Sequence, residues 1–403
     1  MATPEKTLSV ASFNLLSEQM TDDPFPVWNE LRKEHPVFWS ERHESWILTA
    51  YNEVRDALKR DELSVQLGDQ LLARVDGSHP LHRYIKKWMV FCDAPDHTRL
   101  RALVARAFTP GVIGRLHDDV QQIVDELLNE LASEGGGDFM QDFAGPLPAL
   151  VIAEMFGLPR SDRQQIGHWS NAISSVIHRD LMAERFGSGA EAMMEFAEYL
   201  QEHFDRVRKS PDETMLSRLV NAREDGDLLS DDELIATVML FLFAGHETTT
   251  ALLGNGLLAL QRELGGLGTL KKEQAMKTVV EELLRYDGPG RFLVRHVKRP
   301  LEIGGFAMSK GQRVFLAIAS ANRDPSVFER ADKLMLDRDP NRHLGFGVGI
   351  HFCIGANLAR LETQIALKSI QQKFSSLTVD TEQSRWRPVM ISRCLAKLPY
   401  RID

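Results

Sequence analysis

Phe346-Gly-Val-Gly-Ile-His-Phe-Cys-Ile-Gly355 is the most informative stretch of the sequence. Two glycines before Cys353 and one after it permit backbone torsions and close approaches that side chains forbid, so the thiol can sit in a tight loop against a flat object. Residues 356–366 follow with the pattern of a helix, and the amides and dipole at its N-terminus would stabilise a thiolate beside it. The stretch therefore predicts a functional thiolate at Cys353.

The sequence lacks the motifs of several other kinds of site: dinucleotide-binding, zinc-protease, serine-hydrolase and phosphate-binding. The glycines of the loop do not form G-x-G-x-x-G, and His246-Glu247 is followed by three threonines instead of completing the zinc motif H-E-x-x-H. No G-x-S-x-G elbow and no P-loop is present. A cysteine nucleophile beside His351 and a plain buried cysteine both stay open.

A second feature is one very long helix. Ser230-Asp-Asp-Glu233 is a capping box, and the pattern after it has no stop before Gly265-Gly266, about 33 residues or roughly 50 Å. Residues 234–244 are apolar on nearly every side, which predicts burial, but this run is too short to span a bilayer.

The middle of this helix holds residues that suit a buried helix poorly. Gly245-His-Glu-Thr-Thr-Thr250 combines a glycine, a carboxylate and three β-branched hydroxyl residues. Such a local conflict is typical of a functional site. The alternative is purely structural, with threonines bonding to the preceding turn and Glu247 in a salt bridge.

The remaining pattern predicts a mainly α chain with a minor β part, folded as a single unit over residues 1–403. A short helix at 26–34 precedes a hairpin of strands 37–39 and 45–48. One long amphipathic helix is expected from Val112 to Leu131, and further helices at 147–156, 163–177 and 190–207. Short strands are expected at 291–297, 301–303, 306–308 and 313–317.

Composition excludes several classes of protein. The 403 residues carry 48 Lys and Arg against 57 Asp and Glu, a net charge of −9, so we expect no nucleic-acid partner. Three separated cysteines allow neither a disulfide framework nor a zinc knuckle. No export signal and no run of 18 apolar residues is visible, which predicts a cytoplasmic protein without a membrane anchor.

The loop F-G-x-G-x-H-x-C-x-G resembles the haem-binding signature of the cytochrome P450 superfamily. Ala244-Gly-His-Glu-Thr248 is similar to its oxygen-activation segment, Glu282-Leu-Leu-Arg285 to its E-x-x-R pair, and His97-Thr-Arg-Leu-Arg101 to its haem-propionate helix. All four occur in the family's order. The resemblance implies a single large fold with a long central helix and a Cys-bearing haem loop, of the soluble bacterial type.

The resemblance also implies roles for individual residues around a haem b. Cys353 would be the axial thiolate ligand of the iron, which favours O–O cleavage. Glu247 would be a proton-relay acid, and Thr248 would hold bound dioxygen. The other residues implied at the cofactor are Ala244 and Gly245 above it, Phe346 and Gly355 in its loop, and His97, Arg101, Arg295 and His351 as propionate partners. Glu282 and Arg285 would form a buried structural network in which Lys333 takes the place of the family's usual Arg.

The implied activity is monooxygenation of an apolar or amphipathic small molecule, a fatty acid, terpene, steroid or polyketide, using dioxygen and two external electrons. A ferredoxin or flavodoxin-type donor would dock on the Cys353 face of a monomer, near Arg99, Arg106 and Arg360. The substrate contacts expected from position are Leu242, Phe292, Leu293, Met390 and Ile391. The alternatives are a haem-based sensor or oxygen carrier, and a cysteine hydrolase that binds no haem.

Overall fold

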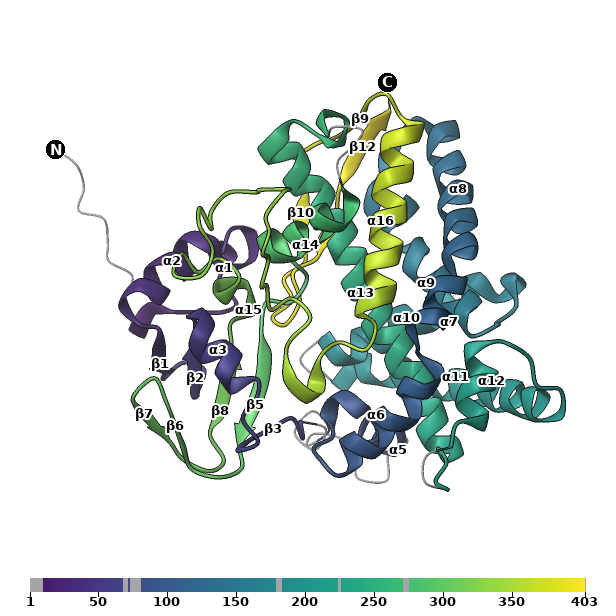
Figure 1. Cartoon of the computed structure of the whole chain (residues 1–403), viewed down its shortest axis with the longest axis horizontal. Coiled ribbons are helices and arrows are strands. Elements are labelled where there is room, and N and C mark those ends of the chain that lie inside the picture. Colours follow the sequence, from purple (N-terminus) through teal and green to yellow (C-terminus); the bar gives the residue numbers. More distant parts are fainter. Residues whose placement is uncertain are drawn as a thin grey trace.

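The computed structural model describes residues 10–67, 72, 81–178, 183–223, 226–270 and 275–402. The protein is 55% helical with small β-sheets, which confirms the predicted mainly α class with a minor β part. Figure 1 shows the long helices gathered in one body, with most of the strands and the N-terminal helices on its left flank.

The helices match most of the predicted segments. They are α1 (Glu18–Asp22), α2 (Phe25–Glu34), α3 (Tyr51–Ala57), α5 (Leu81–Ile85), α6 (Asp96–Ala107), α7 (Pro110–Arg115), α8 (His117–Glu134), α9 (Pro146–Met155), α10 (Arg163–His178), α11 (Ala183–Lys209), α12 (Met215–Asn221), α13 (Asp231–Leu264), α14 (Met276–Asp287), α15 (Ile318–Ala321) and α16 (Ala356–Lys373). Short turns of 3₁₀-helix cover Met89–Phe91 and Gly349–His351, and a π-turn covers Met140–Ala144.

The prediction of one continuous helix over residues 112–131 is wrong. The structure divides it at Leu116 into α7 and α8, because the Leu116 amide bonds to Ile113 three residues back and tightens the turn. Gly114 weakens the same turn, since glycine is a poor helix former. Helix α8 ends at Gly135, which has a left-handed φ of 69°.

The long helix α13 crosses the helical body (Figure 1). It has 34 residues and begins with the predicted capping box, in which the Ser230 side chain and Glu233 satisfy each other's backbone amides. It ends at Gly265, which has a left-handed φ of 81°. Among the described residues α13 is the one helix long and apolar enough to cross a membrane, but 78% of its most apolar window is buried within the protein. Burial in the core accounts for its apolar surface.

The strands form one larger sheet and three small ones. The larger sheet has the order β1-β2-β8-β5-β3, from β1 (Val37–Ser40), β2 (Ser45–Leu48), β8 (Arg313–Leu316), β5 (Leu293–Val297) and β3 (Leu63–Ser64). The predicted hairpin pairs Val37 with Leu48, and β2 runs parallel to β8. The small sheets are β4 (Gly136–Asp138) with β12 (Pro399–Ile402) and β9 (Leu377–Val379), β6 (Leu301–Ile303) with β7 (Phe306–Met308), and β10 (Arg385–Trp386) with β11 (Leu395–Lys397).

Three apolar clusters hold these parts together. The largest lies among the long helices and includes almost every apolar side chain of α13. A second packs the larger sheet against α3 and α15, and a third packs it against α2 through Trp28 and Phe315. The four motifs of the sequence lie on α6, α13, α14 and the loop before α16.

Candidate active site

The cysteine loop is folded by its glycines. Gly347 and Gly349 adopt left-handed φ values of 69° and 80°, which side chains other than glycine rarely tolerate. The loop closes through a hydrogen bond from the Cys353 amide to the Phe346 carbonyl at 2.9 Å. Gly355 has an ordinary φ of −82° and acts differently, because its amide donates to the Cys353 sulfur. The motif glycines thus position the thiol at the start of α16.

The Cys353 side chain presents exposed surface, yet it lies deep enough that desolvation raises the pKa of its thiol. The Gly355 amide and the guanidinium groups of Arg101 and Arg360 oppose this rise. Two apolar side chains of the same loop are exposed as well, Ile350 at 59% and Phe352 at 40%. The loop therefore offers a sulfur ligand together with uncovered apolar surface.

Basic side chains gather beside the loop. The rings of His97 on α6 and His351 in the loop lie with their centroids 4.0 Å apart. Burial, with added repulsion from His97 and Arg295, lowers the pKa of His351 to about 3. Burial also lowers the pKa of Arg295, on β5, to about 10. Arg101, one turn after His97, donates to the Phe352 carbonyl at 2.7 Å. The structure therefore brings these four predicted residues to one place.

This cluster fits a bound dianion. Both ring nitrogens of His97 are buried without a hydrogen-bond partner in the part of the chain described. Within that same part no carboxylate forms a salt bridge with Arg101 or Arg295. Buried cationic donors are costly unless an opposite charge meets them. Two haem propionates would supply that charge, so the residues present fit a haem held by Cys353.

The E-x-x-R pair is fully buried in a network. Arg285 grips Glu282 through two hydrogen bonds of 2.8 Å, and its other guanidinium donors reach backbone carbonyls that include Lys333. The side-chain assignment of Lys333 to this network is wrong, because its ammonium group is exposed and pairs with Asp332. Arg338 is the third member, with its Nε 3.0 Å from Glu282. The arginine that is usual in the family is therefore present as Arg338, five residues after Lys333.

Residues 244–248 expose one face of α13. Between Leu234 and Leu260 the only exposed residues are Ala244 and Thr248, which lie one turn apart. The Thr248 hydroxyl donates to the Ala244 carbonyl at 2.6 Å, the bond to the preceding turn that a structural role would also give. Gly245 lies on a different side of α13, packed against α9, where an added Cβ would meet Ile152 at 2.9 Å. Helix packing alone accounts for that glycine.

Two serines form hydrogen bonds with side chains of residues 244–248, and the sequence predicted neither contact. Glu247 is buried and accepts a hydrogen bond from the Ser392 hydroxyl at 2.9 Å. His246 Nδ1 lies 2.5 Å from the hydroxyl of Ser170 on α10. No motif marks either serine, and 145 and 76 residues separate them from their partners. Only the folded chain brings them together.

The five residues expected at the substrate divide into two groups. Phe292 is 1% exposed and packs edge-on against Trp28 and Phe315, and Leu242 is also 1% exposed in the main core. These two expectations are wrong, because both side chains are enclosed by other core residues. Leu293, Met390 and Ile391 are only half-buried, and their surroundings leave a substrate role open.

Two of the three arginines expected near the docking face, Arg99 and Arg360, are paired with carboxylates. Arg99 forms ion pairs with Asp227 and Glu233. Arg360 forms two hydrogen bonds with Glu281, at 2.6 and 2.9 Å. Burial alone would raise the pKa of Glu281, but the bonds from Arg360 and His343 outweigh it and lower that pKa to about 2. Neither arginine is a free cation for a docking partner.

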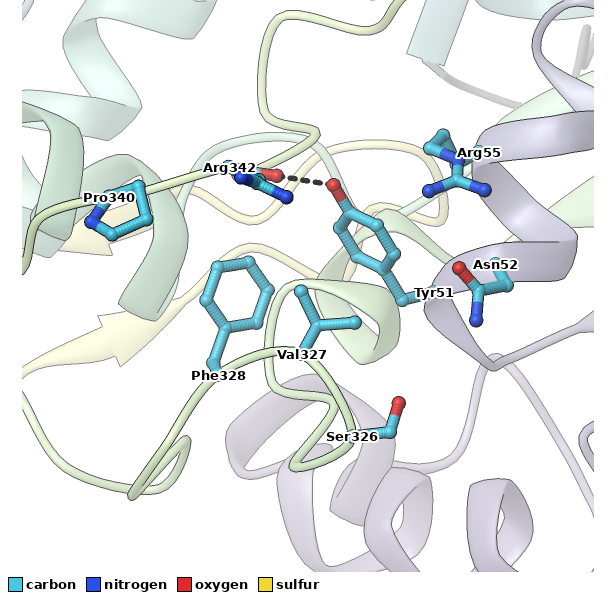
Figure 2. A pocket seen from close by; sticks show the side chains of 8 residues that line it. All are labelled: Tyr51, Asn52, Arg55, Ser326, Val327, Phe328, Pro340 and Arg342. Atoms are coloured by element: carbon cyan, nitrogen blue, oxygen red, sulfur yellow. Dashed lines mark hydrogen bonds between the residues drawn. The ribbon is translucent and has the colours of Figure 1, made fainter.

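A surface cavity of about 450 Å³ lies elsewhere, between α3 and the segment 326–342 (Figure 2). Its lining includes Arg55, Arg342 and Tyr51, whose hydroxyl donates to the Arg342 carbonyl at 2.7 Å. None of the predicted site residues lines it. Phe328 forms its inner wall and also lies beneath the guanidinium of Arg285 at 5.4 Å, so the cavity borders the outer side of the Glu282 network.

Known proteins match the chain over nearly all its length. The family described as "Cytochrome P450" matches residues 4–392. The chain is 37% identical over 408 residues to the polyketide biosynthesis cytochrome P450 PksS of Bacillus subtilis, covering 97% of this chain and 98% of that protein. It is 34% identical over 400 residues to the vitamin D(3) 25-hydroxylase of Pseudonocardia autotrophica, covering 98% and 97%.

Solved structures agree with these sequence matches. The structure of PksS has a TM-score of 0.88 at 35% identity, covering 97% of this chain and 100% of that one. P450BioI, solved in complex with an acyl carrier protein ligated to hexadec-9Z-enoic acid, has a TM-score of 0.89 at 31% identity, with the same coverage. The chain belongs to the cytochrome P450 family of haem-dependent monooxygenases, which are oxidoreductases that need redox partners.

Proposed function

We propose that this enzyme inserts one oxygen atom into a C–H or C=C bond of an apolar or amphipathic small molecule, most specifically a polyketide or fatty-acyl chain. The observation that carries the proposal is the placement of Ala244 and Thr248 as the only exposed positions of the central segment of α13, with Glu247 buried beside them. An exposed hydroxyl next to a held carboxylate is what proton delivery to a reacting oxygen requires.

The cofactor we propose is haem b, which supplies an iron centre for dioxygen activation when bound. Cys353 would hold the iron, and His97, Arg101, Arg295 and His351 would meet the propionates. The chain itself would hold and move protons through Thr248 and Glu247. Family membership removes the cysteine hydrolase from consideration, and we propose that Cys353 serves as the haem ligand instead.

The names of the relatives support the substrate class. PksS is named for polyketide biosynthesis, and the P450BioI structure contains a fatty acid on its carrier protein. Half-buried apolar side chains at Leu293, Met390 and Ile391 suit a long apolar chain. We further propose a cytoplasmic monomer that receives two electrons from a ferredoxin or flavodoxin-type donor on the face of Ile350 and Phe352, whose exposed apolar surface is available for contact.

The purified enzyme should first give the reduced carbon monoxide difference spectrum of a haem thiolate. Spectral titration should then compare a long-chain fatty acid, the same acid on acyl carrier protein, a macrolide and a steroid. The acyl or polyketide ligands should produce the largest shift, and turnover with a ferredoxin and its reductase should yield a product heavier by one oxygen atom. A steroid shift without any acyl or macrolide response would overturn the substrate class.

Replacement of Thr248 separates an enzyme from a haem-based sensor or oxygen carrier. Thr248→Ala should lose most product and release peroxide, whereas Thr248→Ser should keep product formation because it keeps the hydroxyl. A sensor has no use for this hydroxyl. Unchanged ligand binding with no product from either variant or the wild type would favour the sensor.

A further inference from the structure

Ser392 holds the carboxylate beside the exposed face of α13. Its hydroxyl donates to Glu247 Oε1 at 2.9 Å, and both residues are 7% exposed. A hydrogen bond from a hydroxyl to a buried carboxylate is charge-assisted, so it fixes orientation more strongly than a neutral bond does. The position of Glu247 therefore depends on a segment that lies 145 residues further along the chain.

The segment that carries Ser392 is itself firmly fixed. Ser392 forms an isolated β-bridge with Gly290. The Arg291 amide donates to the Ile391 carbonyl at 3.0 Å, and the Arg291 guanidinium donates to the Val389 carbonyl at 2.7 Å. A donor on such a scaffold can hold its acceptor within the narrow tolerance that proton transfer needs.

The next residue strengthens this attachment. The Arg393 amide donates to the Pro289 carbonyl at 2.8 Å, and its guanidinium pairs with Asp287 at 2.6 Å. Asp287 is the last residue of α14, the helix of the E-x-x-R pair. Ser392 is thus anchored on both sides to the segment that follows α14.

The side chains that flank Glu247 on α13 are engaged elsewhere. The adjacent Thr248 hydroxyl donates to the Ala244 carbonyl, and His246 turns toward Ser170 on α10. We propose that Ser392 is a positioning residue for proton delivery, which holds the Glu247 carboxylate in the orientation from which it passes protons toward Thr248. This inference rests on the proposed monooxygenase function and adds a residue that the family motifs do not include.

The same segment carries two of the half-buried side chains suited to substrate, Met390 and Ile391. These two residues adjoin Ser392 in the chain, so the proposed substrate contacts and the Ser392 hydroxyl lie on one short segment.

The test compares Ser392→Thr with Ser392→Val, two variants of nearly equal shape that differ in the hydroxyl. The readouts are product formed per electron pair, peroxide released, and the affinity for the best acyl ligand measured by spectral titration. Ser392→Thr should retain the wild-type product yield. Ser392→Val should give a product yield about five- to tenfold lower, with a matching rise in released peroxide. Its ligand affinity should stay within about twofold of the wild-type value.

A purely structural role of Ser392 predicts something different. Equal yields from the Thr and Val variants, at any level, would overturn the proposal, as would a wild-type yield from Ser392→Ala. In a Glu247→Gln background the change Ser392→Val should add no further loss, because the partner carboxylate is already gone; an additive loss would contradict the proposal. Absence of any product from the wild-type enzyme would instead refute the proposed function itself.

Discussion

The Nε atom of Arg338 lies 3.0 Å from Oε2 of Glu282, and the two residues are 56 positions apart in the chain. Arg285 contacts both oxygens of the same carboxylate, so two guanidinium groups share one buried acid. Asn341 and the Met335 amide add two further donors. This saturated carboxylate ties α14 to the irregular segment that leads into the cysteine loop.

Removal of Arg338 should therefore destabilise the fold strongly. Arg338→Ala leaves part of a buried carboxylate uncompensated, which typically costs about 3–5 kcal/mol of unfolding free energy. Urea denaturation of the wild-type and Arg338→Ala holoenzymes would measure this loss of unfolding free energy. The matched control is Lys333→Ala, whose side chain is 63% exposed and should change the stability by less than about 0.5 kcal/mol. Comparable losses in both variants would contradict the assignment of Arg338.

His97 should govern how tightly the haem is kept. Its two unpartnered ring nitrogens lie buried against His351, so His97→Leu removes a donor that the propionates need. Loss of one hydrogen bond to a charged group is worth about 1.5–3 kcal/mol, which predicts at least roughly tenfold faster haem transfer to an acceptor protein. His117→Leu is the control, because His117 is exposed and pairs with its neighbour Asp118. An unaltered transfer rate in His97→Leu would show that His97 does not face the cofactor.

The sequence predicted those parts of the site that depend on local chemistry. The glycines of the cysteine loop and the capping box of α13 act within a few residues, so their patterns are visible before folding. Ser170 and Ser392 act only through contacts across the fold, and a serine alone carries no distinguishing pattern. The segment 328–345 has no regular period, so its sequence does not distinguish Lys333 from Arg338 as the partner of Glu282.

Acid should weaken the fold through His246. Burial lowers its pKa from the ordinary value of 6.5 to about 4, against smaller opposing effects from Glu247 and Gly145. The unfolded chain then binds the proton more readily than the folded one, so stability is fully present above pH 6.5 and is lost as the pH falls toward 4. The loss amounts to as much as about 3 kcal/mol.

Replacement of His246 with Asn should remove this dependence, because the amide does not titrate. Urea midpoints of wild type and His246→Asn, followed from neutral pH into this window, should converge as the pH falls. His117→Asn is the control, because it makes the same substitution at an exposed histidine. Parallel curves for wild type and His246→Asn would contradict the assignment of this buried neutral ring.

Phe292 should affect stability and leave ligand affinity nearly unchanged, contrary to what its position in the sequence predicted. Its ring lies 5.5 Å from that of Trp28 and 5.9 Å from that of Phe315, inside the cluster between α2 and the larger sheet. Phe292→Ala should therefore cost about 3–5 kcal/mol through the cavity it leaves. Met390, which is half-buried, is the comparison: Met390→Ala should lower ligand affinity in spectral titrations at a smaller cost in stability. A Phe292→Leu variant that folds well but binds ligand about tenfold more weakly would restore Phe292 to the substrate site, because leucine keeps most of the apolar volume that the core requires.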